Sequence, residues 1–157
     1  MTTHQQYLDE AFDLARTSMH TNIGGPFGAV VVKDGVIIGR GGNEVIYQTD
    51  PTAHAEIVAI RNACLETKLF DLTGAVIYST CEPCPMCLAA IYWAGIKEVY
   101  YVLTSNQAEA AGFRDRELYD EFNLPPEKRS VALVRKEFQQ AEAIFDEWKL
   151  KTDKLVY

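Results

Sequence analysis

The sequence predicts an α/β protein whose single domain has three layers, α/β/α, with a mixed sheet of about five strands. Helical and strand-like patterns alternate along 157 residues, which is about the length of one domain. Two β-branched runs on either side of Asp34-Gly35 indicate an antiparallel hairpin. A strand, a helix and another strand follow one another between Ala75 and Val102, which indicates a parallel β-α-β unit.

Local patterns mark the elements of the first half of the chain. Apolar residues at helical spacing predict a helix over 7–19. Runs of β-branched residues predict strands over 29–32 and 36–39. Asp50-Pro51-Thr52 provides the residues that start helices, so the next helix is predicted over 54–65.

The second half continues the alternation. The apolar run 75–79 predicts a buried strand, and a proline opens the helix predicted over 83–94. That helix leads to the strand predicted over 98–102. A weaker strand is predicted over 130–135, followed by a charged helix over 137–151. Because no repeat, low-complexity stretch or linker interrupts the pattern, the whole chain, residues 1–157, is expected to form one domain.

The charge balance and the N-terminus limit the partners and the compartment. Lys and Arg number 15 and Asp and Glu number 22, so the net charge is −7. Proteins that hold nucleic acid through its phosphates usually have a basic face, so the sequence favours a small-molecule partner over nucleic acid. Residues 1–6 lack the features of a signal peptide, and the longest apolar stretch, 87–96, is about half of a membrane span. We therefore expect a cytoplasmic protein with no membrane partner.

The cysteines point to a metal site. Cys81, Cys84 and Cys87 form a C-x-x-C-x-x-C cluster, which is more typical of metal binding than of a disulfide scaffold. Cys84 and Cys87 lie one helical turn apart at the positive end of a predicted helix, which favours the thiolate form. His54, at the start of another predicted helix, would complete three ligands that suit Zn²⁺. Such a site leaves the fourth position for a water, whose pKa near ~7 makes hydroxide available.

Glu56 distinguishes a structural site from a catalytic one. In a helix interior, residues two positions apart point in nearly opposite directions, so His54 and Glu56 could not face one target. The first turn of a helix is looser, and a glutamate side chain is long. Glu56 is therefore predicted to reach the zinc-bound water, take its proton and pass it on, which is general acid–base catalysis.

The same residues also have non-catalytic interpretations. Cys84 and Cys87 alone could be a redox motif or half of an iron–sulfur site. A closed Cys₃His zinc site made from Cys81, Cys84, Cys87 and His54 would leave Glu56 idle. In that case the chain would be a structural or binding protein rather than an enzyme.

Two strings together resemble a known family. Asp50-Pro51-Thr52-Ala53-His54-Ala55-Glu56-Ile57 followed by Cys81-Glu82-Pro83-Cys84-Pro85-Met86-Cys87 is similar to the zinc-dependent cytidine deaminase superfamily, and more closely to its small bacterial guanine deaminases. His-x-Glu followed by Pro-Cys-x-x-Cys is the signature of zinc deaminases. The resemblance covers nearly the whole chain and includes residues 24–29, Asn43, 92–94, 112–115 and Tyr157. It implies a cytidine-deaminase-like fold and the hydrolysis of guanine to xanthine and ammonia.

The resemblance also implies roles for single residues. His54, Cys84 and Cys87 would bind one Zn²⁺ per subunit with a water or hydroxide, and Glu56 would shuttle protons. Asp115 would be a second proton shuttle near the departing amine. The implied substrate-binding residues are Phe27, Asn43, Ala55, Trp93 and Tyr157. Among these, the asparagine would hydrogen-bond the purine, and the phenylalanine and tryptophan would line the base or stack on it.

The family resemblance further implies a homodimer. In such dimers the C-terminal segment, here about 137–157, crosses to the partner subunit. The last residue, Tyr157, would then close the partner's active site.

Other substrates share this motif. Deaminases of adenosine in transfer RNA carry the same Asp-Pro-Thr-Ala-His-Ala-Glu string, and cytosine or an aminotriazine are further candidate substrates. The net charge of −7 counts against RNA. The region from 101 to 157 holds 9 basic and 11 acidic residues, so it forms no basic tail. Gly-Phe-Arg-Asp at 112–115 also differs from the loop expected of the RNA enzymes.

Overall fold

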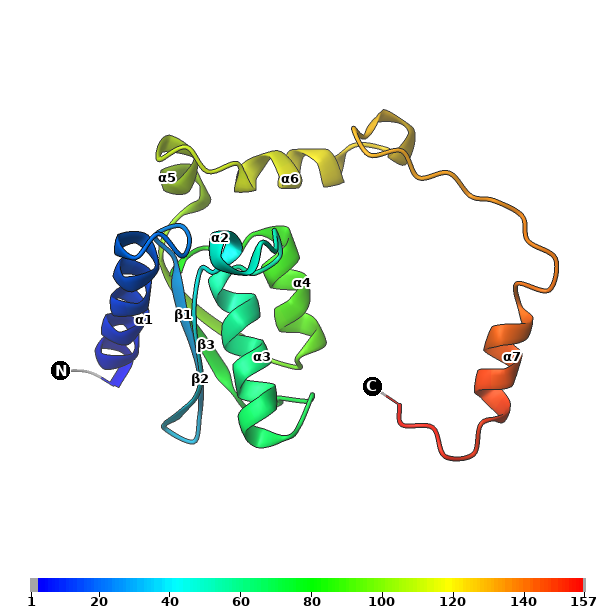
Figure 1. Cartoon of the computed structure of the whole chain (residues 1–157), viewed down its shortest axis with the longest axis horizontal. Helices are drawn as coiled ribbons and strands as arrows, with labels where there is room; N and C mark the ends of the chain where they lie inside the picture. Colours follow the sequence, from blue (N-terminus) through cyan, green and yellow to red (C-terminus); the bar gives the residue numbers. More distant parts are fainter. Residues whose placement is uncertain (1–2, 157) are drawn as a thin grey trace. The chain divides into compact units, whose positions relative to one another are not determined.

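The computed structural model describes residues 3–156, which form two compact units, one ending at Asp120 and one beginning at Glu121 (Figure 1). We describe each unit by itself. The elements of the first unit are α1 (Thr3–His20), β1 (Gly28–Lys33), β2 (Val36–Gly42), α2 (Val45–Gln48), α3 (Ala55–Thr67), β3 (Val76–Cys81), α4 (Pro85–Trp93), β4 (Glu98–Leu103), α5 (Ser105–Ala110) and the first part of α6 (Asp115–Asn123).

The sheet has four strands in the order β2-β1-β3-β4. β1 pairs antiparallel with both β2 and β3, whereas β3 and β4 are parallel. The hairpin is confirmed, and its turn has positive φ at Asp34 (51°) and Gly35 (79°), as an Asp-Gly turn favours. The β-α-β unit is also confirmed, with Ile77 opposite Val99 in the parallel pair. Sequence patterns did not indicate the short helices α2 and α5, or α6.

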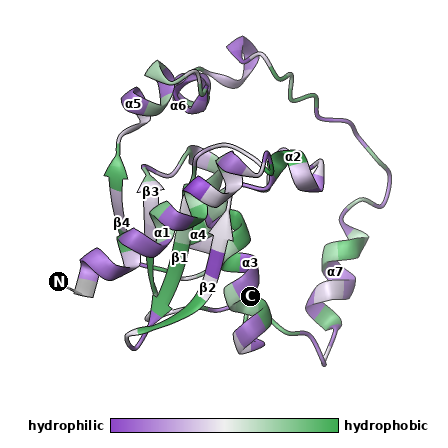
Figure 2. Ribbon diagram, turned by 60° about the vertical axis from the view of Figure 1, so that its left-hand side comes forward, coloured by the Kyte–Doolittle hydropathy of each residue, from purple (hydrophilic) through white to green (hydrophobic). Residues whose placement is uncertain are grey.

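Helices cover both faces of the sheet, which confirms the three predicted layers. On one face, Tyr7 of α1 packs with Val30 and Val32 of β1 and with Tyr78 of β3. On the other face lie α3 and α4 (Figure 1). β1 lies between two strands and is hydrophobic along most of its length (Figure 2), because its alternate residues are buried on both faces.

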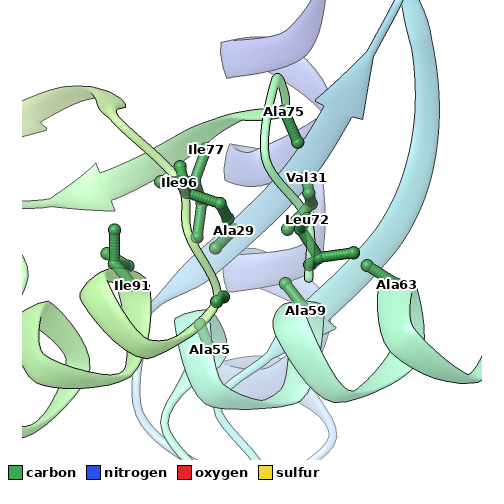
Figure 3. Packing of buried hydrophobic residues seen from close by; sticks show 11 residues of the cluster. Ala29, Val31, Ala55, Ala59, Ala63, Leu72, Ala75, Ile77, Ile91 and Ile96 are labelled. Atoms are coloured by element: carbon green, nitrogen blue, oxygen red, sulfur yellow. The ribbon is translucent and has the colours of Figure 1, made fainter. Parts of the chain in front are cut away.

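Small side chains let α3 lie close to the sheet. Ala55, Ala59 and Ala63 are fully buried along one side of the helix and face the sheet (Figure 3). A Cβ at Gly41 would lie 2.2 Å from the carbonyl oxygen of Ala55. Only glycine therefore permits β2 to approach the first turn of α3 this closely. This contact places the start of α3, which carries His54 and Glu56.

The fifth predicted strand, over 130–135, is wrong. In the described part of the chain this segment pairs with no strand, so the sheet has four strands rather than five. A β-branched run becomes a strand only where another strand supplies backbone partners. Val131, Leu133 and Val134 are instead exposed.

The second unit contains little regular structure. It holds the 3₁₀ turn η1 (Pro126–Lys128) and the helix α7 (Ala143–Leu150), which is shorter than the helix predicted over 137–151. Within this unit, Arg129 Nε donates to the carbonyl of Leu124 at 3.0 Å. None of the described helices has both the length and the apolar character that crossing a bilayer would require.

Candidate active site

Two helix starts bring the predicted metal ligands together. His54 is the N-cap residue of α3 and Cys84 is the N-cap residue of α4, and both have extended backbone dihedrals. Neither side chain caps its own helix in the described part of the chain, so both remain available to another group. Pro85 occupies the first position of α4, where a missing N–H costs no helical hydrogen bond. Cys87 lies in the first turn of the same helix.

The three donor atoms are spaced as zinc ligands. His54 Nδ1 lies 3.6 Å from the sulfur of Cys84 and 3.5 Å from the sulfur of Cys87. All three donors lie within 4.8 Å of one another. Tetrahedral Zn²⁺, with bonds of about 2.3 Å to sulfur and about 2.05 Å to nitrogen, would separate those atoms by roughly 3.6 Å. The distances therefore match a tetrahedral zinc site with three protein ligands.

The charges of the donors also suit a cation. A hydrogen bond from Cys87 lowers the pKa of Cys84 to about 4, so Cys84 is a thiolate. The pKa of Cys87 is raised by that shared hydrogen bond and by burial. A hydrogen bond with Cys84 also raises the pKa of His54. Cys84 thus offers a thiolate to a cation, and two cysteines with one histidine are a donor set that Zn²⁺ prefers.

Glu56 lies beside the metal ligands. It is the second residue of α3, only 6% exposed, and lines the same cavity as His54 and Cys84. Ser79 Oγ donates to Glu56 Oε1 at 3.2 Å and accepts from the backbone N–H of Cys81 at 3.4 Å. These two hydrogen bonds orient the side chains of Ser79 and Glu56. Burial raises the pKa of the Glu56 carboxyl. His54 and Glu56 share the cavity because the N-cap residue is extended and so does not follow helical spacing.

Asn43 presents an amide to this cavity. Its Oδ1 accepts hydrogen bonds from the backbone N–H groups of Gly25 at 3.1 Å and Val45 at 3.4 Å. Because the oxygen is held in this way, the Nδ2 group is the part of the amide left for a ligand. The side chain is buried, so its position is defined before any ligand arrives.

An aromatic pair and a carboxylate complete the cavity. Phe27 and Phe113 both line it and meet edge to face, with ring centroids 4.6 Å apart. Asp115, the first residue of α6, also lines it. Burial raises the pKa of Asp115, and the negative charge of Cys84 adds to that rise.

The structure does not gather every residue predicted for the site. Trp93, at the end of α4, is 78% exposed and does not line the cavity in the described part of the chain. Ala55 is fully buried against the sheet rather than facing the cavity. Tyr157 lies outside the described residues. The cavity also uses Phe113, which sequence reasoning missed as a site residue, although its place two positions before Asp115 was a usable signal.

Cys81 is separate from the ligand group. Its thiol is buried and donates to the carbonyl of Thr104 at 3.7 Å, and burial raises its pKa to about 11. It therefore remains a neutral thiol with a partner of its own. Among the described residues, the metal-binding group consists of His54, Cys84 and Cys87, which argues against the closed Cys₃His site.

We predict that Cys81→Ser keeps one zinc per chain, because the serine hydroxyl replaces a thiol that does not ligate the metal. The measurement is metal content by mass spectrometry after gel filtration. Cys84→Ser is the matched comparison and should lose most of its zinc. A loss of zinc from Cys81→Ser equal to that from Cys84→Ser would establish a fourth protein ligand.

Comparison with known proteins identifies the class to which this fold and site belong. Residues 1–103 match the family described as the cytidine and deoxycytidylate deaminase zinc-binding region. The chain belongs to this family of zinc-binding deaminases. It is 43% identical to the guanine deaminase of Bacillus subtilis strain 168 over 154 residues, which are 98% of this chain and 99% of that protein. The X-ray structure of Bacillus subtilis guanine deaminase matches with a TM-score of 0.94 over 98% of both chains.

The likeness to one RNA-modifying relative is strong but shorter. The tRNA-specific adenosine deaminase of Agrobacterium fabrum is 51% identical over 76 residues. Those residues are 48% of this chain and 50% of that protein. The likeness to this protein therefore extends over about half of the chain, whereas the likeness to the guanine deaminase extends over nearly all of it.

Proposed function

We propose that this chain hydrolyses guanine to xanthine and ammonia. The observation that carries the proposal is the extent of the match to a guanine deaminase, which includes almost every residue of both chains. That extent includes the segment after residue 103, which supplies Phe113 and Asp115 to the cavity. Deamination of adenosine in transfer RNA is the second candidate, since the tRNA-specific relative has a higher sequence identity, 51% against 43%, over a shorter stretch of 76 residues.

Recognition of the base follows from the groups in the cavity. Guanine presents two acceptors, N7 and O6, along one edge, where adenine has one acceptor and an amino donor. The Nδ2 donor of Asn43, held by the two bonds to its oxygen, complements an acceptor edge. The rings of Phe27 and Phe113 provide an apolar wall for a planar base. This combination favours a purine with a carbonyl group.

The residues of the chain perform the proton transfers. When bound, zinc supplies a Lewis acid that lowers the pKa of a water ligand to about 7. Glu56 takes a proton from the attacking water and delivers it to the ring nitrogen beside the amine-bearing carbon. Asp115 donates a proton to the amine, the bond between the carbon and the amine breaks, and ammonia leaves. The hydroxyl that remains on the carbon becomes the carbonyl of xanthine, and its proton returns to the carboxylate of Asp115. We place the reaction in the cytoplasm, where reducing conditions keep Cys84 and Cys87 from forming a disulfide.

The test of the proposed function is ammonia release from guanine, cytosine, adenine, an aminotriazine and an anticodon stem-loop, each incubated separately with the zinc-loaded protein. Ammonia from guanine, with xanthine as the product, is expected. Inosine in the RNA without turnover of guanine would decide for the second candidate. Turnover of cytosine or the aminotriazine in preference to guanine would reject the proposed specificity.

We further propose that the whole chain, residues 1–157, works as one deaminase domain in a homodimer that exchanges its C-terminal segment, about 137–157. Tyr101, Val102 and Leu103 of β4 have exposed side chains, and in the described part of the chain β4 pairs with β3 alone. Such an edge is a template for another strand. The run 130–135, which leads into the exchanged segment and pairs with no strand among the described residues, has the composition of a strand. A second copy can therefore bring this run to the edge as its segment 137–157 crosses over.

Removal of residues 137–157 is expected to turn a dimer into a monomer and to lower guanine turnover at least tenfold, while the zinc content stays the same. Zinc is retained because its ligands all lie before residue 88. Light scattering after gel filtration measures the mass, and ammonia release measures turnover. A monomeric full-length chain, or full activity in the truncated one, would contradict the exchange.

A further inference from the structure

We infer that Tyr119 is a positioning residue for the reaction: the hydrogen bond from its phenol to the carbonyl of Pro83 holds α6 so that Asp115 faces the cavity. This inference rests on the proposed function, because it assigns the residue that places the second proton-transfer group. It concerns the part of α6 that belongs to the first compact unit.

The hydrogen bond joins α6 directly to the metal-binding loop. Tyr119 Oη donates to the carbonyl oxygen of Pro83 at 2.8 Å. Pro83 is buried and immediately precedes the ligand Cys84. The acceptor is therefore part of the backbone that zinc ligation makes rigid, and a donor bound there has a defined position relative to the metal ligands.

Helix geometry links Tyr119 to Asp115. The two residues are four positions apart on α6, so their side chains lie on the same face of the helix. Both are half-buried, whereas the residues between them are exposed, as are Arg114 and Asp120 on either side. None of the described residues of α6 is fully buried. Apolar packing therefore does little to set the rotation of this helix about its axis. The hydrogen bond made by Tyr119 sets that rotation instead, and so fixes the direction of the helix face that carries Asp115.

The loop between β3 and α4, which contains Glu82 and Pro83, also holds the start of the segment that leads to Asp115. The carboxylate of Glu82 accepts the backbone N–H of Ser105 at 2.9 Å, at the beginning of α5. Between this anchor and Tyr119 the chain turns at Gly112, where φ is 95° and an added Cβ would meet no described atom within 4 Å. The turn itself is loosely surrounded, so the contacts on either side of it define where Asp115 lies. These contacts are the anchors on Glu82 and Pro83 and the packing of Phe113 against Phe27.

Loss of the phenol should slow proton transfer without preventing binding. A displacement of about 1 Å in a catalytic group can lower a rate by up to about 100-fold. We expect Tyr119→Phe to lower kcat about tenfold and to change KM less than about twofold, because Phe27, Asn43 and Phe113 remain in place. The zinc content should stay at one per chain.

Tyr7→Phe is the matched control. Tyr7 also donates its phenol to a backbone carbonyl, that of Gly35 at 2.7 Å, but in the hairpin turn. Each variant loses one hydrogen bond and should lower the melting temperature by about 2–4 °C. Only Tyr119→Phe should lower kcat.

The deciding experiment is a double-mutant cycle with Asp115→Asn, run on whichever base the wild-type protein turns over. If Tyr119 acts through Asp115, adding Tyr119→Phe to Asp115→Asn causes no further loss of kcat. An equal tenfold loss in both backgrounds, a kcat for Tyr119→Phe within twofold of wild type, or the same loss of kcat in Tyr7→Phe would each overturn the inference. If guanine is not a substrate, only the proposed function is rejected. The role of Tyr119 is then still tested, because the double-mutant cycle is run on the base that does react.

Discussion

Glu56→Gln is expected to lower kcat on guanine by at least about 100-fold while the protein keeps one zinc per chain. Glutamine has nearly the same shape, and its amide oxygen can still accept the hydrogen bond that Ser79 donates to Glu56 at 3.2 Å. It cannot take a proton from water or carry one to the ring nitrogen. The fold and the metal site should therefore persist while the proton shuttle is lost.

The control for this variant lies on the same helix. Glu66 is an exposed residue of α3, and Glu66→Gln makes the same chemical change away from the cavity. Steady-state ammonia release and metal content are measured for both variants. If Glu56→Gln turned over guanine within a few-fold of Glu66→Gln, the carboxylate would have no part in proton transfer.

Cys84→Ala is expected to lose zinc and to lower turnover by at least about 1,000-fold, because Lewis-acid stabilisation contributes several kcal/mol to the transition state. Cys84 is the thiolate of the cluster, with a pKa of about 4, and its sulfur lies 3.6 Å from His54 Nδ1. Structural coupling adds to this effect, since metal binding stabilises the loop that joins β3 to α4. The variant should therefore also have a lower melting temperature.

Cys64→Ala separates the loss of a ligand from the loss of a thiol. Cys64 is half-buried in α3 and lies outside the metal-binding group, so this variant should keep its zinc and its turnover. Removal of zinc from wild-type protein with a chelator should abolish turnover, and added Zn²⁺ should restore it. Zinc should not restore Cys84→Ala. Retention of one zinc and normal turnover by Cys84→Ala would contradict the assigned ligand set.

Local patterns were sufficient for much of the fold. Asp34-Gly35 specifies a turn with two positive φ angles, and the hairpin formed there. The strand, helix and strand between 76 and 103 were predicted because hydrophobic runs and a proline at a helix start are local signals. The run 130–135 carries a similar signal, but strand formation depends on a partner strand that the described residues of the chain do not provide.

The directions in which the side chains of the site point were less predictable than the identities of the residues that form it. Asn43 was expected to contact the base, but only the structure shows that its oxygen accepts hydrogen bonds from two backbone groups, which leaves the Nδ2 group as the part of the amide that can serve a ligand. Trp93 matches the family pattern yet is exposed in the single chain. Whether a residue faces a cavity depends on the ends of helices and on contacts between distant segments, neither of which has a periodic signal.

The sequence by itself determined the chemistry of the site. His54, Glu56, Cys84 and Cys87 stand at helix starts with a spacing that few other functions use, and residue type with short-range spacing can be read without a structure. The tertiary structure decided which of these groups meet. His54 and Cys84 are 30 residues apart in the sequence. The Nδ1 atom of His54 lies 3.6 Å from the sulfur of Cys84 because α3 and α4 lie on one face of the sheet with their first turns together. The hydrogen bond from Tyr119 to Pro83 spans 36 residues, and no local pattern encodes such a contact, because it depends on how the sheet and its helices pack.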